Sequence, residues 1–158
     1  MSMILHGTVS DNTVVFSRPN AKPIVYNGDM AIAQRGTSFA SLSSGANNVL
    51  DRFAFLVNEG TFTVTQDTST PTGYGFAKSL KIDCTSADTS ISSDGFVQLY
   101  QRFEGQDLQL LKKGTSSAEY ITFSFWVKSN LTGNFVVEVK DHDNSRVICS
   151  LVNISSAD

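Results

Sequence analysis

Two neighbouring stretches late in the chain constrain the fold most. Residues 121–128 (ITFSFWVK) alternate strictly between two faces, and residues 135–140 (FVVEVK) form a second run that favours a strand. Between them, residues 131–134 (LTGN) have the composition of a tight turn. A period of two residues suits a strand and not an amphipathic helix. The sequence therefore predicts a strand, a turn and a second strand in this region.

Other strand-compatible runs are spaced roughly ten residues apart along most of the chain. We expect strands at residues 52–56, 61–65, 79–84, 96–103 and 146–152. Residues 36–48 are small and polar, and we expect a loop there. Residues 104–113 favour either a short helix stopped by Gly114 or an irregular crossover. About seven or eight strands with little helix predict an all-β fold, either an antiparallel β-sandwich or a barrel.

The chain is expected to consist of an N-terminal arm, residues 1–24, and a folded domain, residues 25–158. Short apolar pieces at 3–5 and 14–16 suggest a small hairpin in the arm, which is too short to bury a core of its own. Asn27-Gly28 predicts a turn, and residues 24–26 are a candidate edge strand. The residues expected in the core are Leu80, Ile82, Cys84, Val97, Leu99, Phe123, Phe125, Val127, Val137 and Val139.

Composition excludes several classes of function. The net charge is −3 and the densest basic group is Lys112-Lys113, so we expect no nucleic-acid-binding face. No run approaches about 18 apolar residues, so no membrane-spanning helix is expected. Residues 1–6 have neither the charged nor the long apolar region of a signal peptide. We therefore expect synthesis in a cytosol, where the protein either stays or which it leaves by a route other than secretion, such as lysis.

The reactive side chains point to no catalytic or metal site. Cys84 and Cys149 are interpreted as buried free thiols, with a disulfide left open should their strands be neighbours. Residues 141–144 (DHDN) are interpreted as a hairpin turn, because calcium loops need about six oxygen ligands. No pair of carboxylates is singled out for catalysis. We expect no enzyme activity and no cofactor.

The order of several short blocks resembles that of the jelly-roll carbohydrate-binding modules found beside glycoside hydrolases. The blocks are residues 27–29 (NGD), 79–81 (SLK), 97–102, 114–120 and 124–128 (SFWVK). The resemblance implies an antiparallel jelly-roll β-sandwich. These modules normally continue with closing strands, so we expect the jelly roll to be completed by further residues or by a neighbouring chain. An acidic residue that helps to hold calcium in some of them is Ala31 here, so no metal is expected.

A closer resemblance is to virion appendage proteins of marine and other tailed phages. It is carried by residues 27–38 (NGDMAIAQRGTS) and 50–53 (LDRF), and covers about residues 24–152. It implies a structural virion protein of a tail fibre or related appendage, located in the virion. The implied partners are further copies of the chain, usually in a trimer, other virion proteins and host cell-surface glycan. The alternative is a capsid or head decoration protein that uses the sandwich only for assembly.

Four residues are candidate contacts for a glycan: Trp126, Tyr100, Gln98 and Lys128. If Phe123 and Phe125 point into the core, Trp126 points outward, where an aromatic ring can stack on a sugar. The alternative is that Trp126 is packed under the crossover or a neighbouring subunit. Tyr100 is expected to share the same concave sheet face.

Overall fold

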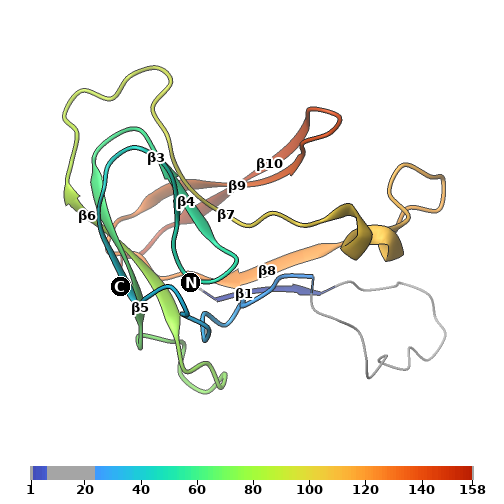
Figure 1. Cartoon of the computed structure of the whole chain (residues 1–158), viewed down its shortest axis with the longest axis horizontal. Coiled ribbons are helices and arrows are strands. Elements are labelled where there is room, and N and C mark those ends of the chain that lie inside the picture. The colour runs from blue at the N-terminus through green and yellow to red at the C-terminus, as the bar shows by residue number, and fades with distance from the viewer. Residues whose placement is uncertain (1, 7–23, 158) are drawn as a thin grey trace. The chain divides into compact units, whose positions relative to one another are not determined.

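The structure is a computed structural model that describes residues 2–6, by their backbone alone, and residues 24–157 (Figure 1). Among residues 24–157, strands take up 41% and helix 5%, and every strand pairing in the described part of the chain is antiparallel, which confirms the all-β prediction. The elements are β1 (Ser2–His6), β2 (Ser38–Leu42), β3 (Gly45–Asn48), β4 (Ala54–Val57), β5 (Thr61–Asp67), β6 (Ser79–Ser86), β7 (Val97–Tyr100), the 3-10 helix η1 (Gly105–Leu111), β8 (Thr122–Trp126), β9 (Gly133–Asp141) and β10 (Arg146–Ile154). The chain divides into two compact units, Met1–Trp126 and Val127–Asp158.

Two three-stranded sheets build the first unit, in the orders β2-β5-β6 and β3-β4-β7. The turn at residues 58–60 leads from β4 in one sheet to β5 in the other, and Gly60 has a φ of 73°, which favours glycine. Strands of both sheets contribute to a single hydrophobic core. The buried apolar residues are Val25, Met30, Val49, Leu50, Phe53, Phe55, Val57, Val64 and Leu80.

The N-terminal residues supply one further strand to this unit. β1 pairs with β8, with Met3 opposite Phe125. The hairpin expected at residues 14–16 lies outside the described residues. Residues 24–26, the candidate edge strand, form bends and a turn, and the predicted Asn27-Gly28 turn is confirmed by a hydrogen bond from Met30 N–H to Asn27 C=O (3.0 Å). No helix in the described part of the chain is long and apolar enough to cross a membrane.

The loop expected over residues 36–48 was a wrong prediction, because this segment holds two strands. β2 pairs with β5 and β3 pairs with β4, each at the edge of its sheet. Serine, glycine and asparagine have low strand propensity, but neighbouring strands supply the hydrogen-bond partners. Phe39 and Leu42 also pack against the core. Pairing thus overrides local propensity in both strands.

The predicted core is correct at some positions and wrong at others. Leu80 is buried, Leu99 packs against the core, and Phe123, Phe125 and Val137 are half-buried. Five predicted core residues are exposed instead, namely Ile82, Cys84, Val97, Val127 and Val139. Strands β6 and β7 lie at sheet edges, so parts of them extend past the core. Val139 belongs to a two-stranded hairpin, which has no second layer of its own.

The two cysteines are free, and both are exposed, so the prediction of buried thiols was wrong. The alternation that suggested burial is present in their strands, β6 and β10. Alternation predicts which residues share a face, but a face is buried only where another layer covers it.

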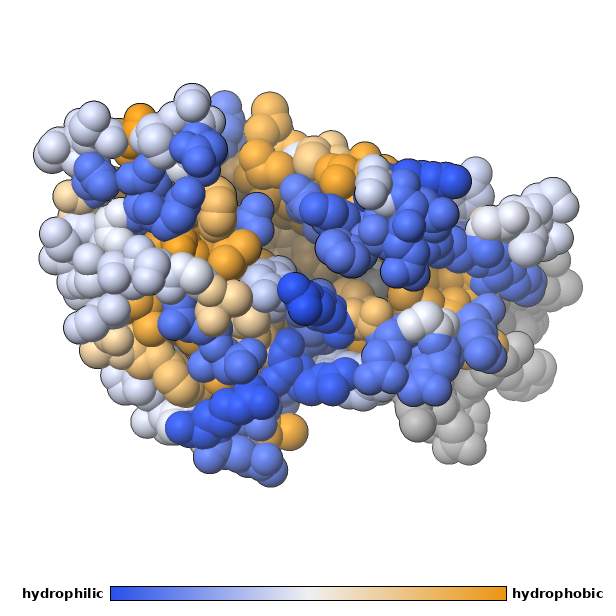
Figure 2. All heavy atoms as spheres, turned by 45° about the horizontal axis from the view of Figure 1, so that its top comes forward, coloured by the Kyte–Doolittle hydropathy of each residue, from blue (hydrophilic) through white to orange (hydrophobic). Residues whose placement is uncertain are grey.

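The second unit is built around the hairpin of β9 and β10, whose turn at residues 142–145 confirms the hairpin turn predicted there, shifted by one residue. Asn144 Nδ2 donates to Asp141 Oδ2 at 2.8 Å at this turn. Six large apolar residues on the hairpin are 47% to 74% exposed: Phe135, Val136, Val139, Val147, Ile148 and Leu151. On the face drawn in Figure 2, hydrophobic residues reach the surface between hydrophilic ones (orange between blue).

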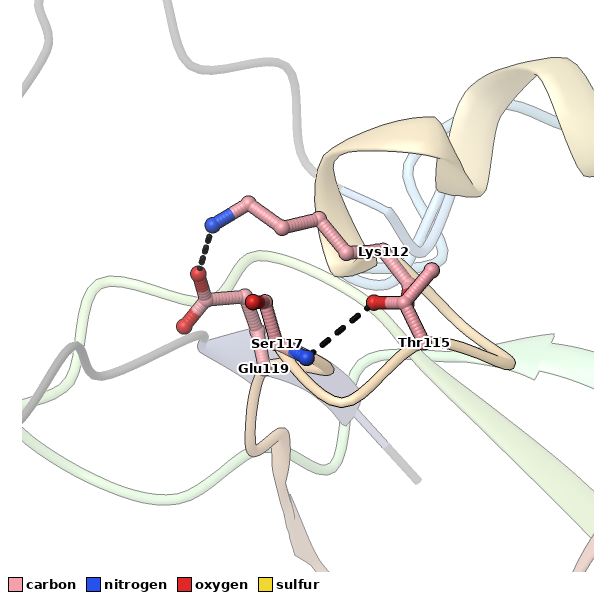
Figure 3. Close-up of polar contacts among 4 residues, drawn as sticks. All are labelled: Lys112, Thr115, Ser117 and Glu119. Carbon is pink, nitrogen blue, oxygen red and sulfur yellow. Dashed lines mark hydrogen bonds and ion pairs between the residues drawn. The ribbon is translucent and has the colours of Figure 1, made fainter.

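Of the two alternatives left open for residues 104–113, the structure has the short helix, η1, which is followed by polar turns. Lys112 ends the helix with a left-handed φ of 48°, and its Nζ lies 2.6 Å from Glu119 Oε1 (Figure 3). Thr115 Oγ1 accepts a hydrogen bond from Ser117 N–H at 3.2 Å. The ion pair is exposed, so it contributes about 0–1 kcal/mol. It orders the turn more than it stabilises the fold.

A side chain at Gly95, just before β7, is expected to destabilise the fold. A Cβ there would lie 2.7 Å from Ile91 Cγ2 and 2.9 Å from Glu59 Cγ, closer than real Cβ contacts. Gly95→Ala should therefore lower the free energy of unfolding by about 1–3 kcal/mol. Gly105→Ala is the matched control, because nothing lies within 4 Å of its Cβ position. Urea denaturation followed by circular dichroism measures both, and equal midpoints for the two variants would contradict the close packing of this loop.

Candidate ligand-binding site

The four candidate residues do not share one sheet face, which corrects that part of the prediction. Tyr100 and Gln98 lie two residues apart on β7, whereas Trp126 ends β8, which belongs to the separate pair with β1. Lys128 is exposed and belongs to the second unit. Trp126 and Tyr100 therefore belong to two different groups of side chains, both within the first unit.

The first group is an aromatic pair formed by Tyr74 and Trp126. Their ring centroids are 4.2 Å apart and the rings are tilted by 48°. Tyr74 is 60% exposed and Trp126 is 42% exposed, so the rings touch each other without being covered. The C–H bonds on one face of a sugar ring pack well against such rings, which offer an apolar surface with polar tips. We call these two residues the aromatic pair.

Tyr74 was not found from the sequence, although one signal was present. It stands between Gly73 and Gly75, which have φ angles of 85° and 76°, in the loop between β5 and β6. Two glycines with left-handed backbone let a loop turn sharply on both sides of a residue and expose it. An aromatic residue between such glycines is a candidate contact, but its neighbour Trp126 is 52 residues away in sequence and only the fold brings them together.

The second group lines a cleft of about 320 Å³. Three arginines, Arg35, Arg52 and Arg102, are on its wall, together with Tyr100, Phe103 and Glu104. We call it the arginine cleft. Its arginines come from three segments: the loop before β2, the turn before β4 and the residues after β7. All three side chains are exposed, and Tyr100 and Phe103 are half-buried.

Asn27 anchors the loop that carries Arg35. Its Nδ2 donates to the carbonyl oxygens of Ile32 (2.9 Å) and Asp51 (3.0 Å), and its Oδ1 accepts from Ile32 N–H (2.8 Å). Asp51 Oδ2 accepts from Gln34 N–H at 2.6 Å. Asparagine tolerates the left-handed φ of 55° that this position requires. These bonds fix residues 27–35 against the turn that carries Arg52.

Two residues have left-handed backbone conformations, one in this loop and one in the turn before β4. Met30, fully buried, has a φ of 58°, and Arg52 has a φ of 72°. Gln66 Nε2 donates a hydrogen bond to Met30 C=O at 2.7 Å and so holds the backbone of Met30 in place. Left-handed φ angles are costly for residues other than glycine, asparagine or aspartate, and they persist only where the surroundings impose them. The burial of Met30 and its backbone hydrogen bonds with Gln66 and Asn27 supply that constraint at Met30.

The side-chain amide of Gln101 holds the backbone of Tyr26. The Gln101 amide accepts from Tyr26 N–H (2.9 Å) and donates to Tyr26 C=O (2.8 Å), as a strand partner would. Arg52 stacks on the Tyr26 ring, 4.7 Å from its centroid. Desolvation raises the pKa of Tyr26, and the charge and hydrogen bond of Asp107 raise it further. The phenol is therefore neutral near pH 7.

Comparisons with family models, with curated proteins and with solved structures gave no match. Within residues 24–157, no group of three or more histidine, cysteine or acidic side chains is placed to hold a metal ion.

Proposed function

We propose that this chain is a non-enzymatic structural protein of a tailed-phage virion, part of a tail fibre or related appendage, that binds host glycan. The aromatic pair is the observation that carries the glycan part of the proposal. Two exposed aromatic rings in contact offer an apolar surface with polar tips, on which a sugar ring can stack. The resemblance of residues 27–38 and 50–53 to phage appendage proteins supports the virion part.

We further propose that the two three-stranded sheets of the first unit are the layers of a jelly-roll sandwich. The support is that both sheets bury side chains in one core and that the turn at residues 58–60 connects them. Single stacking sites bind sugars weakly. Trimeric display on a fibre would raise the overall affinity through avidity, by increasing the effective concentration of sites.

A capsid or head decoration protein is the second candidate, and the β9–β10 hairpin favours it. Exposed apolar residues on both faces of a hairpin suit assembly with other chains. The location of the protein in intact particles distinguishes the candidates. Antibody labelling of the tail supports the appendage, and labelling of the capsid lattice supports decoration.

Trp126 is the only tryptophan, so its fluorescence should report sugar binding directly. We expect glycan that binds the aromatic pair to change the emission of Trp126, and Tyr74→Ala to weaken binding by about two- to tenfold. That range corresponds to an aromatic contact worth about 0.5–1.5 kcal/mol. Tyr120→Ala is the control, because Tyr120 is 87% exposed and precedes β8. Equal losses in the two variants would argue against stacking at Tyr74.

A further inference from the structure

The arginine cleft concentrates positive charge in a protein that is acidic overall. Three of the five arginines of the chain line this one cleft, while the net charge of the chain is −3. They stand at positions 35, 52 and 102, so the sequence contains no run of basic residues that would indicate the cleft. Like charges repel when brought together, and such a cluster is most stable when an anion lies among them.

The three arginines have no acidic partner among the described residues. The ion pairs there are Lys81–Asp83 and Lys112–Glu119, and neither includes an arginine. Glu104 lines the same cleft. Its Oε2 accepts a hydrogen bond from Gln106 at 2.6 Å, which leaves its negative charge in place, so three arginines and one glutamate give the lining a net charge of +2. The guanidinium groups thus keep N–H donors for a ligand, and a guanidinium fork matches an oxyanion with two oxygens.

Aromatic rings hold two of these arginines in position. Arg52 stacks on Tyr26, with 4.7 Å from Cζ to the ring centroid, and Arg102 stacks on Tyr100 at 5.3 Å. Stacking on a ring face leaves the edge of the guanidinium free to donate in its own plane. The rotamers are thereby restricted before any ligand arrives, which reduces the entropy cost of binding.

We propose that the arginine cleft binds the carboxylate or sulfate groups of an acidic polysaccharide. The guanidinium groups bind the oxyanion, while Tyr100 and Phe103 provide apolar wall for the sugar ring. A volume of about 320 Å³ is at the lower end for small-molecule sites, which suits one or two sugar units. The oxyanion chemistry follows from the cleft itself, whereas its assignment to a glycan rests on the proposed function.

A nucleic acid fits this surface less well than a saccharide. Sequence-independent binding to nucleic acid needs a basic face that follows many phosphates, and the chain is acidic outside one compact cleft. An acidic peptide would find the same guanidinium donors, but the aromatic walls favour a ring. Binding of nucleic acid and binding of an acidic peptide are therefore both measured beside binding of saccharides.

Isothermal titration with defined probes tests the proposal. The probes are oligogalacturonate for carboxylates, chondroitin sulfate fragments for sulfates and neutral dextran, with a single-stranded DNA oligomer and polyglutamate as competing anions. We expect at least one acidic saccharide to bind, with affinity falling as salt rises. Arg102→Gln should weaken this binding about tenfold, as for a charge-assisted hydrogen bond. The triple variant Arg35→Gln, Arg52→Gln and Arg102→Gln should abolish it.

Arg146→Gln is the matched control, because Arg146 is also exposed but lies on β10 in the second unit. Glutamine at position 52 retains the backbone strain already present with arginine, and circular dichroism confirms that each variant is folded. Unchanged binding in the triple variant, or tighter binding of DNA or polyglutamate than of saccharide, overturns this inference. Binding of neutral but not acidic glycan overturns it while leaving the proposed function intact. If no saccharide binds, both this inference and the proposed glycan-binding function are overturned.

Discussion

Phe55→Ala is expected to lower the free energy of unfolding of the first unit by about 3–5 kcal/mol. Phe55 on β4 is fully buried and its ring makes an edge contact with Phe62 on β5, with centroids 5.5 Å apart. The contact joins the two sheets, so its loss leaves a cavity where they meet. Urea denaturation followed by far-ultraviolet circular dichroism measures the change.

Phe96→Ala is the matched control for this core substitution. Phe96 is 37% exposed and precedes β7, so its removal should cost about 1 kcal/mol or less. Comparable losses for Phe55→Ala and Phe96→Ala would mean that the two sheets do not share the core described here.

Asn27→Ala is expected to have the second largest effect, a loss of about 2–3 kcal/mol. The substitution removes three hydrogen bonds to Ile32 and Asp51, one of them part-buried, and it places alanine at a φ of 55°. Asn27→Gly separates the two causes, because glycine accepts that φ and loses only the hydrogen bonds. The glycine variant should therefore be more stable than the alanine variant by about 1 kcal/mol.

Asn130→Ala serves as the control, since Asn130 is exposed and lies in the second unit. Its free energy of unfolding should change by less than about 0.5 kcal/mol. Binding to the arginine cleft should weaken in Asn27→Ala as well, because Asn27 anchors the loop of Arg35. An Asn27→Ala variant as stable as the Asn130→Ala control would refute the anchoring role.

The strands that alternate most clearly were the ones that could be predicted from sequence. The run at residues 121–128 contains β8, and Trp126 lies on its more exposed face while Phe123 and Phe125 are half-buried. The period of two fixes which residues share a face. It does not say which strand pairs with which, and β8 pairs with β1 while β9 pairs with β10.

The candidate site could be predicted only in part, because its residues come from loops far apart in sequence. Tyr100 was identified from its strand, but Arg35 and Arg52 lie in connecting segments that side-chain hydrogen bonds hold in place. Tyr74 lies in a loop between two glycines with left-handed backbone. Asn27 and Gln101 supply such bonds to backbone groups. Local sequence patterns do not encode these long-range contacts. For the same reason β2 and β3 were not predicted, because they form by pairing with neighbouring strands.

A glycan array probed with wild-type protein and with Trp126→Ala tests the central claim most directly. The account predicts that wild-type protein binds a restricted set of host-surface glycans and that Trp126→Ala loses binding to those that stack on the aromatic pair. Tyr120→Ala should bind as wild type does, since Tyr120 has no ring partner among the described residues. Equal binding by wild type and Trp126→Ala, or no glycan binding by the wild type, would contradict the account.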